Sequence, residues 1–186
     1  MLSEEAMLHT ALKNGAHKAA LIRVKDIPFR REFRQACAAN SCGKYGKCWT
    51  CPPDVGDIDE LITYAKTFDR CLLFQTVSEL EDSFDIEGML EAGRAHSELT
   101  RSVWRELQPQ MPQDTLMLSA GGCGACERCA KETNEPCRHP EQALASLEAY
   151  GIAVSEVAAL GKMKYINGED TVTYFSAVLF HGKGDE

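Results

Sequence analysis

The spacing of apolar and polar residues predicts three helices. Residues 4–15 and 85–107 carry apolar side chains three or four positions apart, which is the period of one helix face. A third helix is expected over residues 57–66. The first and third helices are each preceded by a residue suited to an N-terminal cap, Ser3 in one and Asp57 or Asp59 in the other.

Short apolar runs predict strands at four places: residues 19–24, 70–77, 115–119 and 171–180. The last run, rich in β-branched and aromatic residues, has the strongest strand signal. Asn167-Gly168 just before it predicts a hairpin turn.

Between residues 140 and 154 the sequence predicts one more helix. Pro140 suits its first turn, Tyr150 lies near its end and Gly151 is its expected C-terminal cap, with Ile152–Val154 extended behind it. Strands and helices mix without the regular alternation of a doubly wound sheet. The expected fold class is α+β: a mixed or antiparallel sheet packed with helices in a single domain (1–186), with two cysteine-rich metal-binding loops (37–53 and 121–140) at one edge.

Composition is that of an ordinary globular protein. The chain has 186 residues, 44% of them hydrophobic, and no apolar run approaches the roughly 18 residues that a membrane-spanning helix needs. The first residues include two acids and lack the basic and apolar regions of a signal peptide. We therefore expect a cytoplasmic protein with no membrane partner. Thiols stay reduced in that compartment, so clustered cysteines indicate metal or redox chemistry rather than disulfides.

The net charge of −8 is unevenly distributed. Residues 18–48 contain eight Lys or Arg against Asp26 and Glu32, a local charge of +6, so the remainder carries −14. An acidic whole argues against nucleic-acid binding. The basic stretch could receive a small anionic ligand or an acidic partner, although a solvated face that balances nearby anionic sites explains it better, because the basic residues are mixed with apolar ones.

Eight of the nine cysteines fall into two groups of four. The second group begins with a Cys-x2-Cys-x2-Cys run and comprises Cys123, Cys126, Cys129 and Cys137. Bacterial ferredoxins use such a run to bind a cubic iron–sulfur cluster. The glycines at 121, 122 and 124 let the backbone approach a metal centre closely. Zinc sites more often pair two Cys-x2-Cys knuckles across a long spacer, so we expect a [4Fe–4S] cluster, with zinc as the alternative.

Two residues near the end of this group leave the ligand set open. Cys137 follows a gap of seven residues and comes after Pro136, whereas the last ferredoxin cysteine precedes a proline. Cys137 can therefore serve either of two centres. His139 is a candidate replacement ligand, although a surface or capping role explains it better.

The first group is more loosely spaced and comprises Cys37, Cys42, Cys48 and Cys51. Its spacing matches neither a zinc ribbon nor a ferredoxin, yet four thiols within fifteen residues still favour a metal. Tyr45 and Trp49 are candidates for an apolar shell around it. The ninth cysteine, Cys71, lies in a predicted strand and is interpreted as a small buried hydrophobe, with a spare ligand as the alternative.

Sequence signatures of other function classes are absent: there is no P-loop, no G-x-S-x-G and no G-x-G-x-x-G after a strand. The Cys-x3-Cys-x2-Cys triplet of radical S-adenosylmethionine enzymes is missing too. The five histidines are scattered, so no catalytic set can be assembled. Whether the protein is an enzyme stays open at this point.

Five segments carry a resemblance to a known family. They are Cys42-Gly43-Lys44-Tyr45-Gly46, Trp49-Thr50-Cys51-Pro52-Pro53, Gly122-Cys123-Gly124 with Cys126 and Cys129, Pro136-Cys137-Arg138-His139-Pro140-Glu141, and Ser146-x-Glu148-Ala149-x-Gly151-Ile152. They resemble a family of predicted metal-binding proteins of anaerobic bacteria and archaea, catalogued as a domain of unknown function. The resemblance covers about residues 18–180. It implies a cysteine-rich, iron–sulfur protein without an established reaction, and in the family pattern the position of Cys48 is commonly not cysteine.

Three functions fit these features. The first is electron transfer, or redox support of a partner enzyme, through one or two [4Fe–4S] clusters and with a redox partner protein. The second is an enzyme that uses the open iron of a three-cysteine cluster, which the doubt over Cys48 suggests. The third is a structural zinc module, in which the thiolates stabilise the fold.

Overall fold

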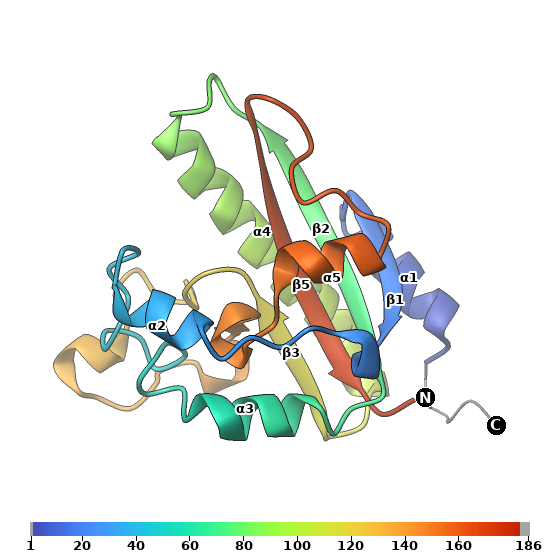
Figure 1. The fold of residues 1–186 in the computed structure, drawn as a ribbon, viewed down its shortest axis with the longest axis horizontal. Helices are drawn as coiled ribbons and strands as arrows, with labels where there is room; N and C mark the ends of the chain where they lie inside the picture. Colours follow the sequence, from blue (N-terminus) through green and yellow to red (C-terminus); the bar gives the residue numbers. More distant parts are fainter. Residues whose placement is uncertain (1, 183–186) are drawn as a thin grey trace.

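The computed structural model describes residues 2–182 and contains an open five-stranded sheet in the order β1-β2-β5-β3-β4 (Figure 1). Neighbouring strands are antiparallel except for the parallel pair β3–β4. The strands are β1 (Lys18–Arg23), β2 (Arg70–Glu79), β3 (Thr115–Ser119), β4 (Ala145–Ser146) and β5 (Thr171–Phe180). The predicted α+β class with a mixed sheet is confirmed, and each of the four predicted strands is present.

Helices cover both faces of the sheet. On one face α1 (Glu4–Lys13) and α4 (Ile86–Leu107) pack against the side chains of Leu72, Phe74 and Val178. On the other face α3 (Ile58–Ala65) and α5 (Val154–Leu160) enclose a second apolar cluster. Residues 71–75 of β2 and 175–180 of β5 are buried throughout, because both of their faces are covered. This double burial explains why their sequences are mostly apolar, with Gln75 and Ser176 as buried polar exceptions.

The helix starts agree with the predicted caps. The Ser3 hydroxyl accepts a hydrogen bond from the backbone N–H of Ala6, and the Asp57 carboxylate accepts from Asp59 and Glu60. Asp85 caps α4 in the same way. Five short 3-10 segments complete the described secondary structure: η1 (Val24–Asp26), η2 (Gln108–Gln110), η3 (Ala130–Thr133), η4 (Pro140–Gln142) and η5 (Glu148–Tyr150).

The prediction of one helix from Pro140 to Tyr150 is wrong. Only η4 and η5 are helical there, and between them β4 pairs with the end of β3. The backbone N–H of Leu147 also donates to the carbonyl of Ser119, so the edge of β3 holds this segment extended. Gly151 does end η5, with φ +73°, and a Cβ at that position would lie 2.8 Å from Cδ1 of Ile62.

Three other local expectations need correction. Ile152 forms an isolated bridge with Phe29, but Val154 begins α5 rather than continuing an extended segment. The short helix α2 (Phe33–Ala38) was not predicted. Gly168, with φ +150°, does lie in a turn before β5. That turn is not a hairpin, because β5 pairs with β2 and β3 and neither strand adjoins it in sequence.

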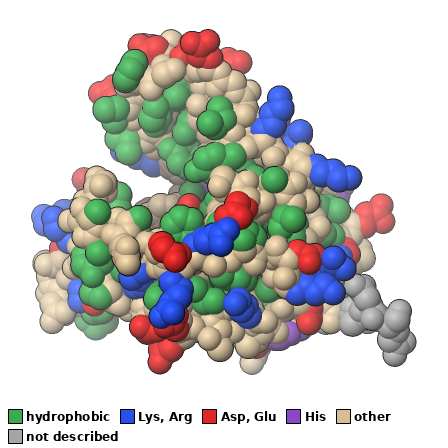
Figure 2. Space-filling model, in the orientation of Figure 1, with side chains coloured by type: hydrophobic (Ala, Val, Ile, Leu, Met, Phe, Trp, Pro, Cys, Tyr) green, Lys and Arg blue, Asp and Glu red, His purple; other side chains and the backbone are tan. Residues whose placement is uncertain are grey.

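The end of the sheet near the start of α4 projects from the rest of the molecule (Figure 1). β2 and β5 extend there beyond their pairing with β1 and β3. Large apolar side chains stand exposed near this end, including Phe84, Ile86 and Leu90 at 87%, 68% and 57%. Hydrophobic groups also gather at the top of the molecule in Figure 2. This end adds little to the buried core.

Within the part of the chain that the structure describes, no helix is both long enough and apolar enough to cross a membrane. The long helix α4 carries charged side chains along its length and buries only one face.

Candidate metal centre

The two cysteine loops, 37–53 and 121–140, meet at the β3–β4 side of the sheet (Figure 1). Contacts between residues far apart in sequence join them. Trp49 Nε1 donates to the carbonyl of Glu135 at 2.9 Å, and Lys131 Nζ lies 4.3 Å from the centre of the Trp49 ring. Lys131 also forms a largely buried ion pair with Asp54 at 2.5 Å, with side chains 19% and 17% exposed. These contacts close the first loop onto the second.

Local backbone geometry shapes each loop. In the first loop Gly43 and Gly46 have positive φ, and the N–H of Gly46 donates to the carbonyl of Pro52. In the second loop Gly121 and Gly124 have φ of +64° and +63°, a conformation that side chains disfavour. The predicted role of these two glycines in curling the backbone is supported by this geometry.

A cavity of about 110 Å³ lies between the loops. Four of its lining side chains are those of the second group, Cys123, Cys126, Cys129 and Cys137. The fifth thiol comes from the first group and belongs to Cys48. The sequence predicted two separate sets of four. The structure instead brings Cys48 to the cavity of the other set.

Cys48 is the most buried of the clustered cysteines, with 4% of its surface exposed. It forms a hydrogen-bonded pair with Cys51, in which the Cys51 thiol donates to the Cys48 sulfur and lowers the pKa of Cys48. The Thr50 hydroxyl, 3.4 Å away, and the backbone N–H of Cys123 lower it further. The hydrogen bond that Cys51 donates to Cys48 raises the pKa of Cys51, and burial raises it further. The arrangement stabilises one thiolate at the junction of the two loops.

The other thiols of the first group lie close to this junction. Cys37 is on α2 and Cys42 is exposed in the turn that follows, and both are near enough to Cys51 to raise its pKa electrostatically. Burial raises the pKa of Cys37. A methyl group on Gly122 would lie 3.8 Å from Cys51 Sγ, so Cys51 lies against the backbone of the second loop at this glycine.

Cationic side chains surround the thiols. Lys44, Lys47 and Arg138 line the cavity. Arg101, which projects from α4, donates through Nη2 to the carbonyl of Cys123 and lies 3.9 Å from its sulfur. Sequence reasoning missed Arg101, because it belongs to the polar side of an amphipathic helix and nothing local marks it. Positive charge at these positions suits the binding of an anionic group in the cavity.

Not every candidate ligand is brought to the site. Cys71 is buried in β2 opposite Ile22 and Leu179, and burial raises its pKa to about 12, which confirms its reading as a small core residue. His139 is a surface residue, 46% exposed, with Nδ1 3.9 Å from Glu141. Neither residue is among those that line the cavity. Among residues 2–182, no three His, Cys, Asp or Glu side chains converge closely enough to hold a single metal ion.

The structure assembles a histidine network that the sequence did not reveal. His96 is 1% exposed, and its two ring nitrogens lie 2.8 Å from Thr76 Oγ1 and Ser176 Oγ. Ser176 Oγ in turn contacts the hydroxyls of Thr100 and Ser119 at 2.8 and 3.3 Å. The network satisfies polar groups between α4 and the sheet and ends at the last residue of β3. Its burial and its partners indicate a structural role.

The basic stretch 18–48 divides into separate environments. Arg30 and Arg31 form ion pairs with Glu156 and Asp59 at 2.9 and 2.6 Å. Oppositely charged side chains lie next to one another over the middle of the face in Figure 2. Lys44 and Lys47 reach the cysteine cavity instead, and Lys25 lines a different cleft. Ion pairs with nearby acids therefore account for part of the positive charge of residues 18–48.

The joined cysteine loops bring five thiols to one cavity, and thiols of this kind are common metal ligands in proteins. A family model described as "Predicted metal-binding protein (DUF2284)" matches residues 20–180, and the chain belongs to this family. No curated protein and no solved structure gives a significant match.

Proposed function

We propose that this protein binds one or two [4Fe–4S] clusters and serves in electron transfer or as a redox accessory to a partner enzyme. The observation that carries the proposal is the cavity lined by five thiols, Cys48 from one loop and Cys123, Cys126, Cys129 and Cys137 from the other. A bound cluster would supply one-electron chemistry at this position.

The donor set fits a cluster better than a single zinc ion. The cavity has a volume of about 110 Å³. A sphere the size of a water molecule occupies only about 10–15 Å³ of cavity volume, so the cavity has room for more than one small ion. The thiols surround the space without three of them converging on one point in the described residues. A zinc ion instead needs four ligands at one point. The Cys-x2-Cys-x2-Cys run would provide three ligands, with Cys48 and Cys137 as candidates for the fourth.

The surroundings support a redox role. The backbone N–H of Cys123 is directed at the Cys48 sulfur, and hydrogen bonds to sulfur tune cluster potentials. Cys37, Cys42 and Cys51 are the candidate ligands of a second centre, and Cys51 lies against Gly122 of the second loop. Two centres in adjoining loops would suit electron exchange between them. The lysines and arginines around the cavity suit an acidic redox partner, and reduced thiols suit the cytoplasm.

The test is anaerobic purification followed by absorption spectroscopy and analysis of iron, acid-labile sulfide and zinc. We expect a brown protein with equal amounts of iron and sulfide, whose visible absorption bleaches on reduction. Cys126→Ser should lose most of this iron, while Cys71→Ser, a matched change in a core thiol, should retain it. A colourless protein with stoichiometric zinc would contradict the proposal and leave the structural zinc module in its place.

A second candidate function follows from the position of Cys48. If Cys48 ligates the centre in the second loop, three thiols remain for the first site: Cys37, Cys42 and Cys51. Such a site leaves one iron open to substrate, as an enzyme would require. Cyanide added to the reduced protein should then shift the electron paramagnetic resonance signal of one centre, and Cys37→Ser should abolish that shift. Spectra unchanged by cyanide would exclude the open iron.

A further inference from the structure

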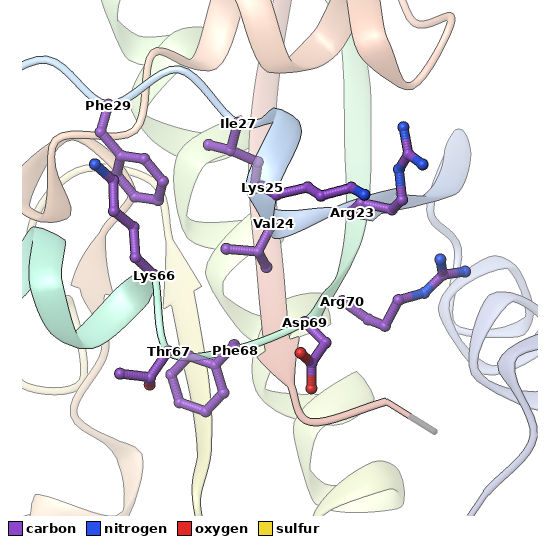
Figure 3. Close-up of a pocket in the computed structure, with 10 residues that line it drawn as sticks. All are labelled: Arg23, Val24, Lys25, Ile27, Phe29, Lys66, Thr67, Phe68, Asp69 and Arg70. Carbon is purple, nitrogen blue, oxygen red and sulfur yellow. The ribbon is translucent and has the colours of Figure 1, made fainter. Parts of the chain in front are cut away.

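We propose that a cleft beside β1, which shares no lining residue with the cavity between the cysteine loops, binds a small organic anion: a carboxylate or phosphate group attached to a flat apolar body. The cleft has a volume of about 530 Å³ and lies between η1 with its following segment and the turn that joins α3 to β2 (Figure 3). Volumes of roughly 300–1,000 Å³ are usual for small-molecule sites.

The base of the cleft is apolar and rigid. Val24, Ile27 and Phe68 line it and are 1%, 6% and 3% exposed, so each is anchored in the core beneath. Phe29 adds a half-buried ring at one side, and its backbone is fixed by the bridge to Ile152. Figure 3 shows these groups between the cationic side chains. A flat apolar group on this surface would remove aromatic and aliphatic area from water.

The charged residues around the cleft are mostly cations. Arg23, Lys25, Lys66 and Arg70 line it, against one acid, Asp69. Asp69 lies 3.5 Å from His181, which also contacts Asp114. The lining is therefore suited to an anion.

Two of the four cations are already paired. Arg23 bonds Asp26 at 2.7 Å, and Arg70 bonds Glu4 at 2.7 Å. Lys25 and Lys66 have no carboxylate partner among residues 2–182, and Lys66 Nζ lies over the Phe29 ring at 5.4 Å. Each of these two ammonium groups is free to bind the charged end of a ligand, and Figure 3 shows Lys66 beside Phe29 and Lys25 extending toward Arg23 on the other side.

The chemistry of the lining selects the ligand class. A free inorganic anion would use the lysines but leave the apolar base in contact with water. A neutral aromatic compound would cover the base but leave the ammonium groups without a counter-charge. An aromatic carboxylate or aryl phosphate satisfies both, and an aromatic ring can share the Phe29 surface with the Lys66 ammonium. No cysteine lines this cleft in the described chain, so ligand binding here does not depend on the metal proposal.

The experiment titrates the purified protein with four probes: benzoate, phenyl phosphate, inorganic phosphate and benzyl alcohol. Calorimetry measures affinity, and amide chemical shifts of Val24, Thr67 and Phe68 report the location. We expect benzoate, phenyl phosphate or both to bind and shift these amides, and inorganic phosphate and benzyl alcohol to bind more weakly by about tenfold. The stronger of the two aromatic anions identifies the charged group.

The matched variants are Lys25→Gln with Lys66→Gln, and Lys18→Gln as a control. Lys18 is an exposed lysine at the far end of β1 and does not line the cleft. The double variant should weaken the aromatic anion by about tenfold or more, and the control by less than about twofold. The proposal is overturned if no probe shifts these amides, or if all three substitutions weaken binding alike. Folding of the variants is checked by their unchanged amide spectra elsewhere.

Discussion

The sheet with its covering helices and the pair of cysteine loops are built in different ways. The sheet region buries mostly apolar side chains on both faces of β2 and β5. In the cysteine lobe, by which we mean loops 37–53 and 121–140 together, Cys48 is the one clustered cysteine that is fully buried. The lobe is held by a few polar contacts between its loops, such as the Trp49–Glu135 hydrogen bond and the Lys131–Asp54 ion pair.

This difference indicates where folding free energy comes from in each region. Burial of apolar area stabilises the sheet without any ligand. The lobe has little apolar area to bury, and its cationic residues and paired thiols suit an anionic centre that bonds the two loops together. The protein is therefore expected to have a core that folds alone and a lobe that depends on its metal. Four predictions test this contrast, beginning with the largest effect.

Removal of the metal should unfold the lobe and spare the sheet. Metal binding contributes ~10 kcal/mol in small domains that fold around a structural metal. After treatment with a chelator we expect amide exchange in residues 37–53 and 121–140 to rise by about a hundredfold or more. Amides of β2 and β5 should keep their protection. A single cooperative loss of protection over the whole chain would show that the two regions are not separate.

A substitution that creates a cavity in the core should destabilise the sheet and leave metal binding in the lobe unchanged. Leu73 is fully buried in β2 beneath α5, so Leu73→Ala is expected to lower the free energy of unfolding by ~3 kcal/mol. The metal content of the folded variant should stay that of the parent protein. Urea denaturation followed by circular dichroism measures the change. Leu160→Ala, at a site 45% exposed, is the control and should cost less than ~0.5 kcal/mol.

Mild acid should weaken the core through His96. Burial lowers the pKa of His96 to about 4, below its ordinary value of 6.5. Between pH 6.5 and 4 the unfolded chain therefore binds a proton that the folded protein does not. Stability is unaffected by this group above pH 6.5 and declines by ~3 kcal/mol as the pH falls to 4.

The His96 prediction is checked by urea denaturation at several pH values between 7.5 and 4.5. His96→Gln loses hydrogen bonds and is less stable at every pH, but its stability should fall less steeply over this interval. Equal slopes in the two proteins would assign the acid sensitivity to other groups, including the metal site.

Loosening the contact between the loops should have the smallest effect. Trp49→Phe keeps an aromatic ring beside Lys131 and removes the hydrogen bond to Glu135, at a cost of ~1 kcal/mol. We expect about fivefold faster loss of metal to a chelator. Trp104→Phe, in α4 of the sheet region, should leave that rate unchanged. A faster rate in both variants would mean that the core and the lobe are coupled.

Much of the sheet region could be predicted from the sequence, because each element there is defined by its own periodicity and caps. The amphipathic helix α4 and the runs that became β2 and β5 are examples. The segment after Pro140 could not be, since pairing of Ala145 and Ser146 with β3 outweighs the local preference for helix. Helix α5 was missed because its seven residues are too few for a clear period.

The cysteines of the candidate site could be predicted from the sequence, but which of them line the same cavity could not. The spacing of Cys123, Cys126 and Cys129 is local and shows directly in the sequence. That Cys48 lines the same cavity depends on contacts across about ninety positions, which spacing does not encode. The same holds for Arg101, which reaches Cys123 from a helix that precedes it in the chain.

The position of Trp49 provides an optical consequence. The chain has two tryptophans, and one lies in each region: Trp49 in the lobe, against Lys131, and Trp104 on α4 in the core. A coloured centre bound between the loops would quench the emission of Trp49 by energy transfer, because this indole lies in the contact between the two loops. Fluorescence from single-tryptophan variants would then follow the assembly of the lobe and the folding of the core as separate signals in one molecule.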